Sequence, residues 1–268
     1  MIRLIGIDVD GTLVGSSGQV HPSIWQATER ARAAGIRLTL CSGRPAFGVA
    51  LDYARRLDPD AWHVFQNGAS VVHLGTHESR SAELPPTSVH ALMARSRRSG
   101  EVLELYSDTS YAVEERASDF AQRHAELLGV PYEPRSFESL KGPIVRAQWV
   151  VLPAQAEREM ATPHPGLEVS QSESPLMRDV RFIGMTREGV NKGSAVRAVA
   201  SAYGVDLKDV MYVGDANNDL SALQVVGCPV AMGNASVGVR QVARKTVGHV
   251  DEAGLAQALQ WAVAGGGA

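Results

Sequence analysis

Apolar and polar positions in the first third of the chain alternate between two patterns. Residues 2–8 and 36–41 form mainly apolar runs of strand length, whereas 23–35 and 45–57 carry apolar residues at helical spacing. A glycine ends the first helical pattern and a proline opens the second, as is typical of helix boundaries. Strands interleaved with helices predict a parallel sheet that is covered by helices on both faces.

A strand pair follows these elements. Residues 62–66 and 67–74 are two apolar stretches, and the second opens with Asn-Gly, a dipeptide that favours a tight turn between antiparallel strands. From about Glu83 the pattern changes, beginning with a proline-rich break. The next hundred residues mix helices (88–100, 117–129), strands (102–107, 111–114, 145–152) and a polar, loop-like section (162–175).

The strand–helix alternation returns after residues 180–185. The elements expected from there on are a helix at 192–204, a strand at 209–215, a helix at 218–227, a strand and loop at 228–235, and a helix at 252–263. We therefore predict an α/β fold with a Rossmann-like parallel-sheet core. The core comprises residues 1–84 and 185–268, and an α+β domain, residues 85–184, is inserted between its two halves.

Composition narrows the class of protein. Hydrophobic residues make up 44% of the 268 positions and charged residues 21%, with a formal net charge of −3. This is typical of a globular protein, and it gives no basic field for nucleic acid or an anionic membrane. Cys41 and Cys228 lie far apart in apolar runs, which favours core residues of a reducing compartment over a disulfide. We expect a cytoplasmic protein, a monomer or small homo-oligomer, without a signal peptide or membrane span.

Polar residues gather where the predicted strands end. In an open parallel sheet, ligands bind outside the carboxyl ends of the strands. The residues at these ends, together with one lysine that opens a helix, are Asp8, Asp10, Ser42, Gly43, Arg44, Lys192, Asp215, Asn218 and Asp219.

This set of side chains suits phosphoryl transfer. A carboxylate can attack phosphorus, and further carboxylates can hold Mg²⁺, which neutralises crowded negative charge. A hydroxyl, backbone amides and a lysine can hold the transferring oxygens. Asp8 and Asp10 repel each other, and they become tolerable together once a divalent cation and Lys192 lie among them.

Each residue alone has a simpler interpretation. Ser42 is a typical helix cap, Lys192 a typical surface lysine, and Asp215 and Asn218 could belong to a turn. Four such motifs, in one order and at four strand or helix boundaries, favour a catalytic site instead.

The motifs "DVDGT", "SGR", "NKG" and "GDANND" occur complete and in that order. With them, the sequence resembles the haloacid dehalogenase superfamily of phosphohydrolases over nearly its whole length. The "NGA" after the third strand, the insertion of about a hundred residues and "MGNA" near the end resemble the Cof-type group within it. The resemblance implies that the inserted domain is a cap over the active site.

The resemblance also implies catalytic and metal-binding roles. Asp8 is expected to be the nucleophile and a Mg²⁺ ligand. Asp10 is expected to be the general acid and base, with its backbone carbonyl on the metal. Lys192 neutralises charge between the phosphate and the nucleophile, while Asp215 binds Mg²⁺ and Asp219 supports the metal shell.

The remaining roles concern the substrate. By the same resemblance, Ser42 and Gly43 bind the phosphoryl oxygens, and Arg44 and Asn218 contact phosphate or substrate. Asn217 stands where this group often has a glutamate, which leaves substrate details open.

The expected activity is Mg²⁺-dependent hydrolysis of phosphate monoesters of small metabolites, sugar phosphates or cofactor phosphates, through an aspartyl-phosphate. The alternatives are a phosphotransferase or phosphomutase acting on phosphosugars, and a non-catalytic protein that binds a phosphorylated ligand. In the inserted domain, we predict that Lys141 and Arg146 are solvated surface charges, with contact to an anionic substrate as the alternative.

Overall fold

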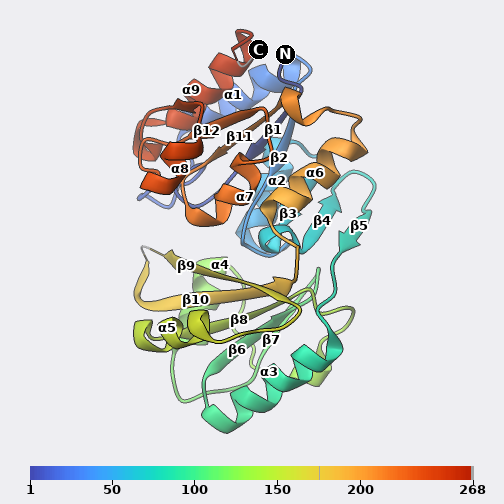
Figure 1. Cartoon of the computed structure of the whole chain (residues 1–268), viewed down its shortest axis with the longest axis vertical. Coiled ribbons are helices and arrows are strands. Elements are labelled where there is room, and N and C mark those ends of the chain that lie inside the picture. The colour runs from blue at the N-terminus through green and yellow to red at the C-terminus, as the bar shows by residue number, and fades with distance from the viewer. Residues whose placement is uncertain (175, 267–268) are drawn as a thin grey trace.

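The computed structural model describes residues 1–174 and 176–266. The molecule has two halves, one above the other in Figure 1. The upper half contains both termini and a parallel sheet, and the lower half contains an antiparallel sheet formed by the middle of the chain. The predicted fold class, α/β with a central parallel sheet, is confirmed.

The central sheet is formed by short strands in the order β13-β12-β11-β1-β2, all parallel and mostly buried except for the edge strand β13. Both faces of the sheet are covered, so that β1 reads as an unbroken apolar run with all four residues buried. The strands are β1 (Leu4–Ile7), β2 (Arg37–Leu40), β11 (Val210–Gly214), β12 (Cys228–Ala231) and β13 (Lys245–Thr246).

Six helices cover this sheet. One face packs against α1 (Pro22–Ala33), α2 (Val49–Leu57) and α9 (Gly254–Val263). The other face packs against α6 (Lys192–Ala202), α7 (Leu220–Leu223) and α8 (Val237–Val242). The three layers give two apolar clusters, one on each side of the sheet, both drawn from residues outside 85–184.

A hairpin extends the sheet beside β2. A single parallel bridge joins Cys41 to Val64 in β3 (Trp62–Phe65), and β3 pairs with the antiparallel strands β4 (Ser70–His73) and β5 (Ser79–Ser81). The turn between β3 and β4 is the 3₁₀ segment η1 (Gln66–Gly68). The predicted strand–turn–strand unit is therefore confirmed.

The lower half is built on a second five-stranded sheet, which we call the cap sheet, with strand order β7-β6-β8-β10-β9. It packs with three helices and has two apolar clusters of its own, formed mainly by residues 84–185. Its elements are α3 (Pro86–Ser99), β6 (Val102–Tyr106), β7 (Tyr111–Val113), α4 (Phe120–Leu128), β8 (Arg146–Val151), α5 (Pro153–Ala161), β9 (Leu167–Ser174) and β10 (Met177–Arg187).

Four further 3₁₀ segments connect these elements. They are η2 (Phe137–Ser139), η3 (Leu207–Asp209), η4 (Asn217–Asp219) and η5 (Val250–Glu252). Within residues 1–174 and 176–266, no helix is both long enough and apolar enough to cross a lipid bilayer.

Three local predictions are wrong. The helix expected at 218–227 is only the four-residue α7, Leu220–Leu223, which follows the 3₁₀ segment η4. The helix expected from Pro45 begins only at Val49, because Gly48 has φ +63° and ψ −151°, a conformation that leaves the helix. The residues before it form a loop that carries Phe47 onto the rings of Tyr106 and Tyr111, with ring centroids 6.5 and 6.2 Å away. The section 162–175 is also not a loop, because its described residues include strand β9.

The division into core and cap stays a prediction, which a deletion tests. Because both clusters of the parallel sheet lie outside 85–184, replacing this segment with a short Gly-Ser linker is expected to leave a folded core. Circular dichroism should show mixed α/β structure, and heating should give one cooperative transition.

The deletion would expose Phe47, which packs against the apolar cluster of the cap sheet that includes Tyr106 and Tyr111. Because an exposed phenylalanine favours aggregation, a second deletion variant also carries Phe47→Ser. If both variants lack a cooperative transition, the two halves depend on one another for folding and the boundary is wrong.

Candidate active site

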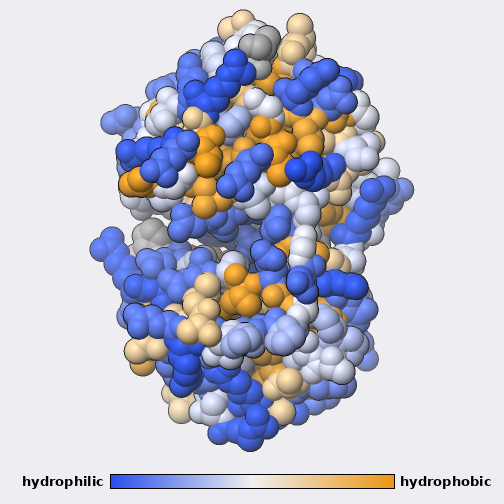
Figure 2. Space-filling view, viewed as in Figure 1, coloured by the Kyte–Doolittle hydropathy of each residue, from blue (hydrophilic) through white to orange (hydrophobic). Residues whose placement is uncertain are grey.

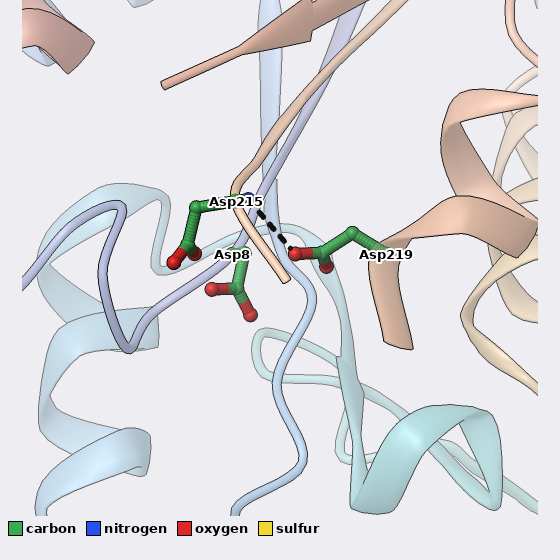
Figure 3. A group of neighbouring side chains, drawn as sticks. All are labelled: Asp8, Asp215 and Asp219. Atoms are coloured by element: carbon green, nitrogen blue, oxygen red, sulfur yellow. Dashed lines mark hydrogen bonds between the residues drawn. The ribbon is translucent and has the colours of Figure 1, made fainter. Parts of the chain in front are cut away.

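The chemistry-bearing residues meet where β1 and β11 end. Asp8 follows β1, Asp215 follows β11, and Asp219 lies in η4. Figure 3 shows their carboxylates grouped around one small space. One ligand atom from each lies within 4.8 Å of the others. In the sheet, β1 has β2 on one side and β11 on the other, so the chain connections diverge at its carboxyl end. The three carboxylates therefore lie at the topological switch point of the sheet.

Lys192 neutralises part of this charge. It is the first residue of α6, and its fully buried Nζ lies 2.5 Å from Asp8 Oδ1 and 2.7 Å from Asp219 Oδ1. Burial alone would lower the pKa of Lys192, but the two carboxylates more than offset that effect, so its pKa is raised. Lys192 is therefore a fixed positive charge in the site rather than a surface lysine.

Asp219 has its acceptor positions occupied from within the protein. Its Oδ1 accepts from Lys192 and from the hydroxyl of Tyr212, at 2.7 Å each. Its Oδ2 accepts from the backbone amides of Asp215 and Ala216, at 3.0 and 3.1 Å. Four donors on one carboxylate leave little capacity for a metal, so Asp219 holds Lys192 and the Asp215 backbone in place.

Asp215 is held more loosely. Its Oδ1 accepts from Thr12 Oγ1 at 3.1 Å, and its Oδ2 accepts from Asn234 Nδ2 at 3.3 Å. Gly11 makes room for it, because a Cβ there would lie 2.2 Å from Asp215 Oδ2 and Gly11 has φ +88°. Burial, helped by the charge of Asp219, raises the pKa of Asp215 to about 7.

The surroundings of Asp8 disfavour its charged form, as those of Asp215 do. Burial and the neighbouring charge of Asp219 raise the pKa of Asp8 well above its usual range, although Lys192 opposes them. Three carboxylates face one ammonium here, so the site is short of positive charge. A divalent cation fits this deficit, and Asp8 and Asp215 have carboxylate lone pairs to offer it.

Asp10 is exposed and belongs to a different contact. Its carboxylate accepts two hydrogen bonds from the guanidinium of Arg44, Nε to Oδ2 at 3.0 Å and Nη2 to Oδ1 at 2.6 Å. Arg44 is largely buried. Burial lowers the pKa of Arg44, but its contact with Asp10 raises that pKa by more, so the pKa is raised overall. The bidentate pair fixes where the Asp10 carboxylate points.

The remaining predicted residues line the same region. Ser42 is buried, and its Oγ accepts from the Arg44 amide at 3.0 Å. Asn218 donates from Nδ2 to Asn67 Oδ1 at 3.3 Å, and Asn67 also borders Gly43. The structure thus brings Ser42, Gly43 and Asn218 together at one edge of the sheet.

The prediction for Arg146 is wrong, while Lys141 is exposed as predicted. Arg146 is buried in strand β8, where its Nη1 donates to the carbonyl of Gly43. It therefore connects the cap sheet with the loop after β2. In Figure 2, a groove lined mainly by hydrophilic residues separates the two halves on the visible face.

Sequence reasoning also missed contributing residues. Asn234 donates to the carbonyl of Gly11 as well as to Asp215, and Tyr212 reaches Asp219 from inside strand β11. Asn234 lies in the "MGNA" motif, which indicated only a resemblance to the Cof-type group and no contact with Asp215. Nothing local in the sequence distinguishes Tyr212 from a core residue.

Comparisons with known proteins agree with this geometry. A model of the haloacid dehalogenase-like hydrolases matches residues 5–259. The chain is 28% identical to "Putative phosphatase YxeH" of Bacillus subtilis (strain 168), covering 97% of each chain. It is 24% identical to "5-amino-6-(5-phospho-D-ribitylamino)uracil phosphatase YitU" of the same organism, covering 96% of each.

A solved structure gives the same result for the fold. A haloacid dehalogenase-like hydrolase from Bacteroides thetaiotaomicron superposes with a TM-score of 0.85 at 25% identity, covering 97% of this chain and 99% of that one. Motifs, fold and site geometry all lead to one assignment: the chain belongs to the haloacid dehalogenase-like hydrolase family.

Proposed function

We propose that this protein is a Mg²⁺-dependent phosphatase that hydrolyses phosphate monoesters of small metabolites through an aspartyl-phosphate on Asp8. The observation that carries the proposal is the buried group of Asp8, Asp215 and Asp219 around Lys192 at the switch point of the sheet. The phosphatase names of relatives that match nearly the whole chain support it.

We assign the role of nucleophile to Asp8. One of its oxygens is bonded to Lys192, which orients the carboxylate and leaves the other oxygen to attack phosphorus. The new bond joins an Asp8 oxygen to phosphorus while the bond to the leaving oxygen breaks. Mg²⁺, held by Asp8 and Asp215, would neutralise the charge of the phosphoryl group and keep both carboxylates ionised.

Asp10 serves the proton transfers. It first protonates the leaving oxygen and then takes a proton from the water that attacks the phosphoryl group, which releases inorganic phosphate and restores Asp8. The bidentate contact with Arg44 holds the carboxylate at the rim of the site before substrate binds. Ser42, Gly43 and Asn218 are the groups we assign to the phosphoryl oxygens.

The name of a relative supports the proposed substrate class. YitU is named for 5-amino-6-(5-phospho-D-ribitylamino)uracil, a small phosphorylated metabolite. Sugar phosphates and cofactor phosphates are therefore the classes that we propose for this chain.

The first prediction concerns pH and the metal. Unfolded Asp215 loses its proton near pH 4, whereas the folded, metal-free protein keeps it to about pH 7. The folded state binds more protons in this window, so this group's contribution to stability falls as pH rises from about 4 to about 7. Mg²⁺ should therefore raise Tm more at pH 8 than at pH 5.5, by about 2–4 °C per kcal/mol of binding.

Thermal unfolding with chelator and with Mg²⁺ measures this effect. Asp215→Asn should abolish the Mg²⁺-induced shift and should exceed the wild-type Tm in chelator at pH 8. Asp206→Asn, an exposed carboxylate paired with Lys208, removes the same charge elsewhere and should respond as the wild type does. Equal Mg²⁺ shifts at both pH values would contradict the assignment of Asp215.

The second prediction separates the two acids that begin the catalytic motif. Asp8→Asn removes the attacking oxygen, so hydrolysis should fall to background. Asp10→Asn keeps the nucleophile and loses the proton shuttle, which costs about 10²- to 10⁴-fold in rate. With p-nitrophenyl phosphate, whose leaving group needs little protonation, formation of the aspartyl-phosphate should slow less than its hydrolysis.

The readout is labelled phosphate on the protein after acid quenching. Asp10→Asn should accumulate acid-stable, hydroxylamine-sensitive label, and Asp8→Asn should carry none. Label trapped on Asp8→Asn would show that the nucleophile is a different carboxylate.

A further inference from the structure

The two faces of the cap sheet differ in character. Along β8, Ala147 and Trp149 belong to the apolar cluster with residues of α3 and α5. Because side chains alternate along a strand, Arg146 and Gln148 lie on the opposite face. The same face carries an apolar cluster with α4 that includes Val150, but Arg146 reaches Gly43 of the core from it, so the polar part of this face meets the parallel-sheet half.

Arg146 is a buried charge without a charged partner. Its side chain is about nine-tenths buried, and no carboxylate among the described residues lies within 4.0 Å of it. Glu104, which acts on it from a distance, is already occupied by Tyr106, His124 and Gln148. Buried charges in proteins are normally paired, so a missing anion is the simplest complement to this guanidinium.

One edge of the guanidinium is also unused. Nη1 donates to the Gly43 carbonyl, but Nε has no hydrogen-bond partner among the described residues although it is buried. Both Nε and Nη2 border the space above Gly184 in strand β10, since a Cβ built there would lie 3.5 and 3.8 Å from them. That edge of an arginine is the one that binds carboxylates and phosphates with two parallel hydrogen bonds.

Gly184 leaves room for one methyl group beside this edge. The pairing of β9 with β10 puts Ser170 opposite it, and Ser170 Oγ would lie 3.4 Å from the same Cβ. All three distances are ordinary contacts, so a methyl group would fit. A glycine, a serine hydroxyl and an unpaired guanidinium edge thus surround one methyl-sized volume on the Arg146 side of the cap sheet.

We propose that this volume is a subsite for an oxyanion on the leaving group of the substrate, either a carboxylate or a second phosphate. Arg146 Nε and Nη2 would donate to the anion, and Ser170 would add a hydroxyl. The bond from Arg146 to Gly43, next to Ser42, places the anion a short distance from the phosphoryl group. The inference rests on the proposed phosphatase function and narrows its substrates to phosphate esters with a second negative charge.

The test uses pairs of substrates that differ only in that charge. They are 3-phosphoglycerate with glycerol 3-phosphate, 4-phosphoerythronate with erythritol 4-phosphate, 6-phosphogluconate with glucitol 6-phosphate, and 1,3-propanediol bisphosphate with its monophosphate. The acid pairs report a carboxylate site at three spacer lengths, and the last pair reports a second phosphate. The wild type should prefer the charged member of at least one pair by about 10- to 100-fold in kcat/KM.

Variants then assign the preference to the subsite. Arg146→Gln should bring the ratio of charged to neutral substrate to about one. The ratio cancels any effect on the Gly43 loop, because both members of a pair share the phosphoryl site. Gly184→Ala fills the volume with a methyl group that fits beside the guanidinium and should also lower the ratio. Arg181→Gln, a partly buried arginine paired with Glu173, is the matched control and should keep it.

Binding measurements keep the inference independent of turnover. Dissociation constants of the same pairs, measured by calorimetry on Asp8→Asn with Mg²⁺, should show the same preference and the same loss on adding Arg146→Gln. Equal binding within every pair, or a preference that survives Arg146→Gln, would overturn the subsite. Absence of Mg²⁺-dependent p-nitrophenyl phosphate hydrolysis would instead overturn the phosphatase proposal, whatever the pairs show.

Discussion

The buried ammonium of Lys192, between the buried carboxylates of Asp8 and Asp219, is the constraint on which the half with the parallel sheet depends. Lys192 Nζ can lie 2.5 and 2.7 Å from Asp8 and Asp219 only if α6 starts beside the ends of β1 and β11. Removing one partner of such a buried pair costs about 3–5 kcal/mol, because the other charge is left uncompensated. Segments almost two hundred residues apart in the chain are therefore held at one point.

Because of this ion pair, Asp8, Asp215 and Asp219 have different hydrogen-bond partners and different roles. Asp219 receives four donors and fixes the lysine, so it is a positioning residue. Asp8 and Asp215 are left with raised pKa values and fewer donors, which is the state of carboxylates that await a cation. A divalent cation would relieve the repulsion among these carboxylates, and the proposed chemistry needs such a cation.

The sequence predicts a residue's place in the structure well where its neighbours along the chain determine that place, and poorly where distant segments determine it. The strands of the central sheet are apolar runs with polar ends, so β1, β2 and β11 and their acids could be placed from local pattern. Strand β9 could not, because only Leu167 and Val169 among its eight residues are apolar, as suits a half-exposed edge strand. Arg146 resembles any exposed arginine in sequence, since its burial depends on Gly43, 103 positions away.

The proposed chemistry and the proposed recognition involve different halves of the molecule, and hydrogen bonds join these halves. Arg146 donates to the Gly43 carbonyl, and Gln66 Nε2 donates to the Ser107 carbonyl at 3.0 Å, so both bonds join the core to the cap. Burying the Arg146 guanidinium without an anion is costly, and burial lowers its pKa. An anion beside Gly184 would remove that cost only while the halves are together. Under the proposed subsite, a substrate with a second negative charge would pair with this guanidinium where the two halves meet, and a substrate without that charge would leave it unpaired.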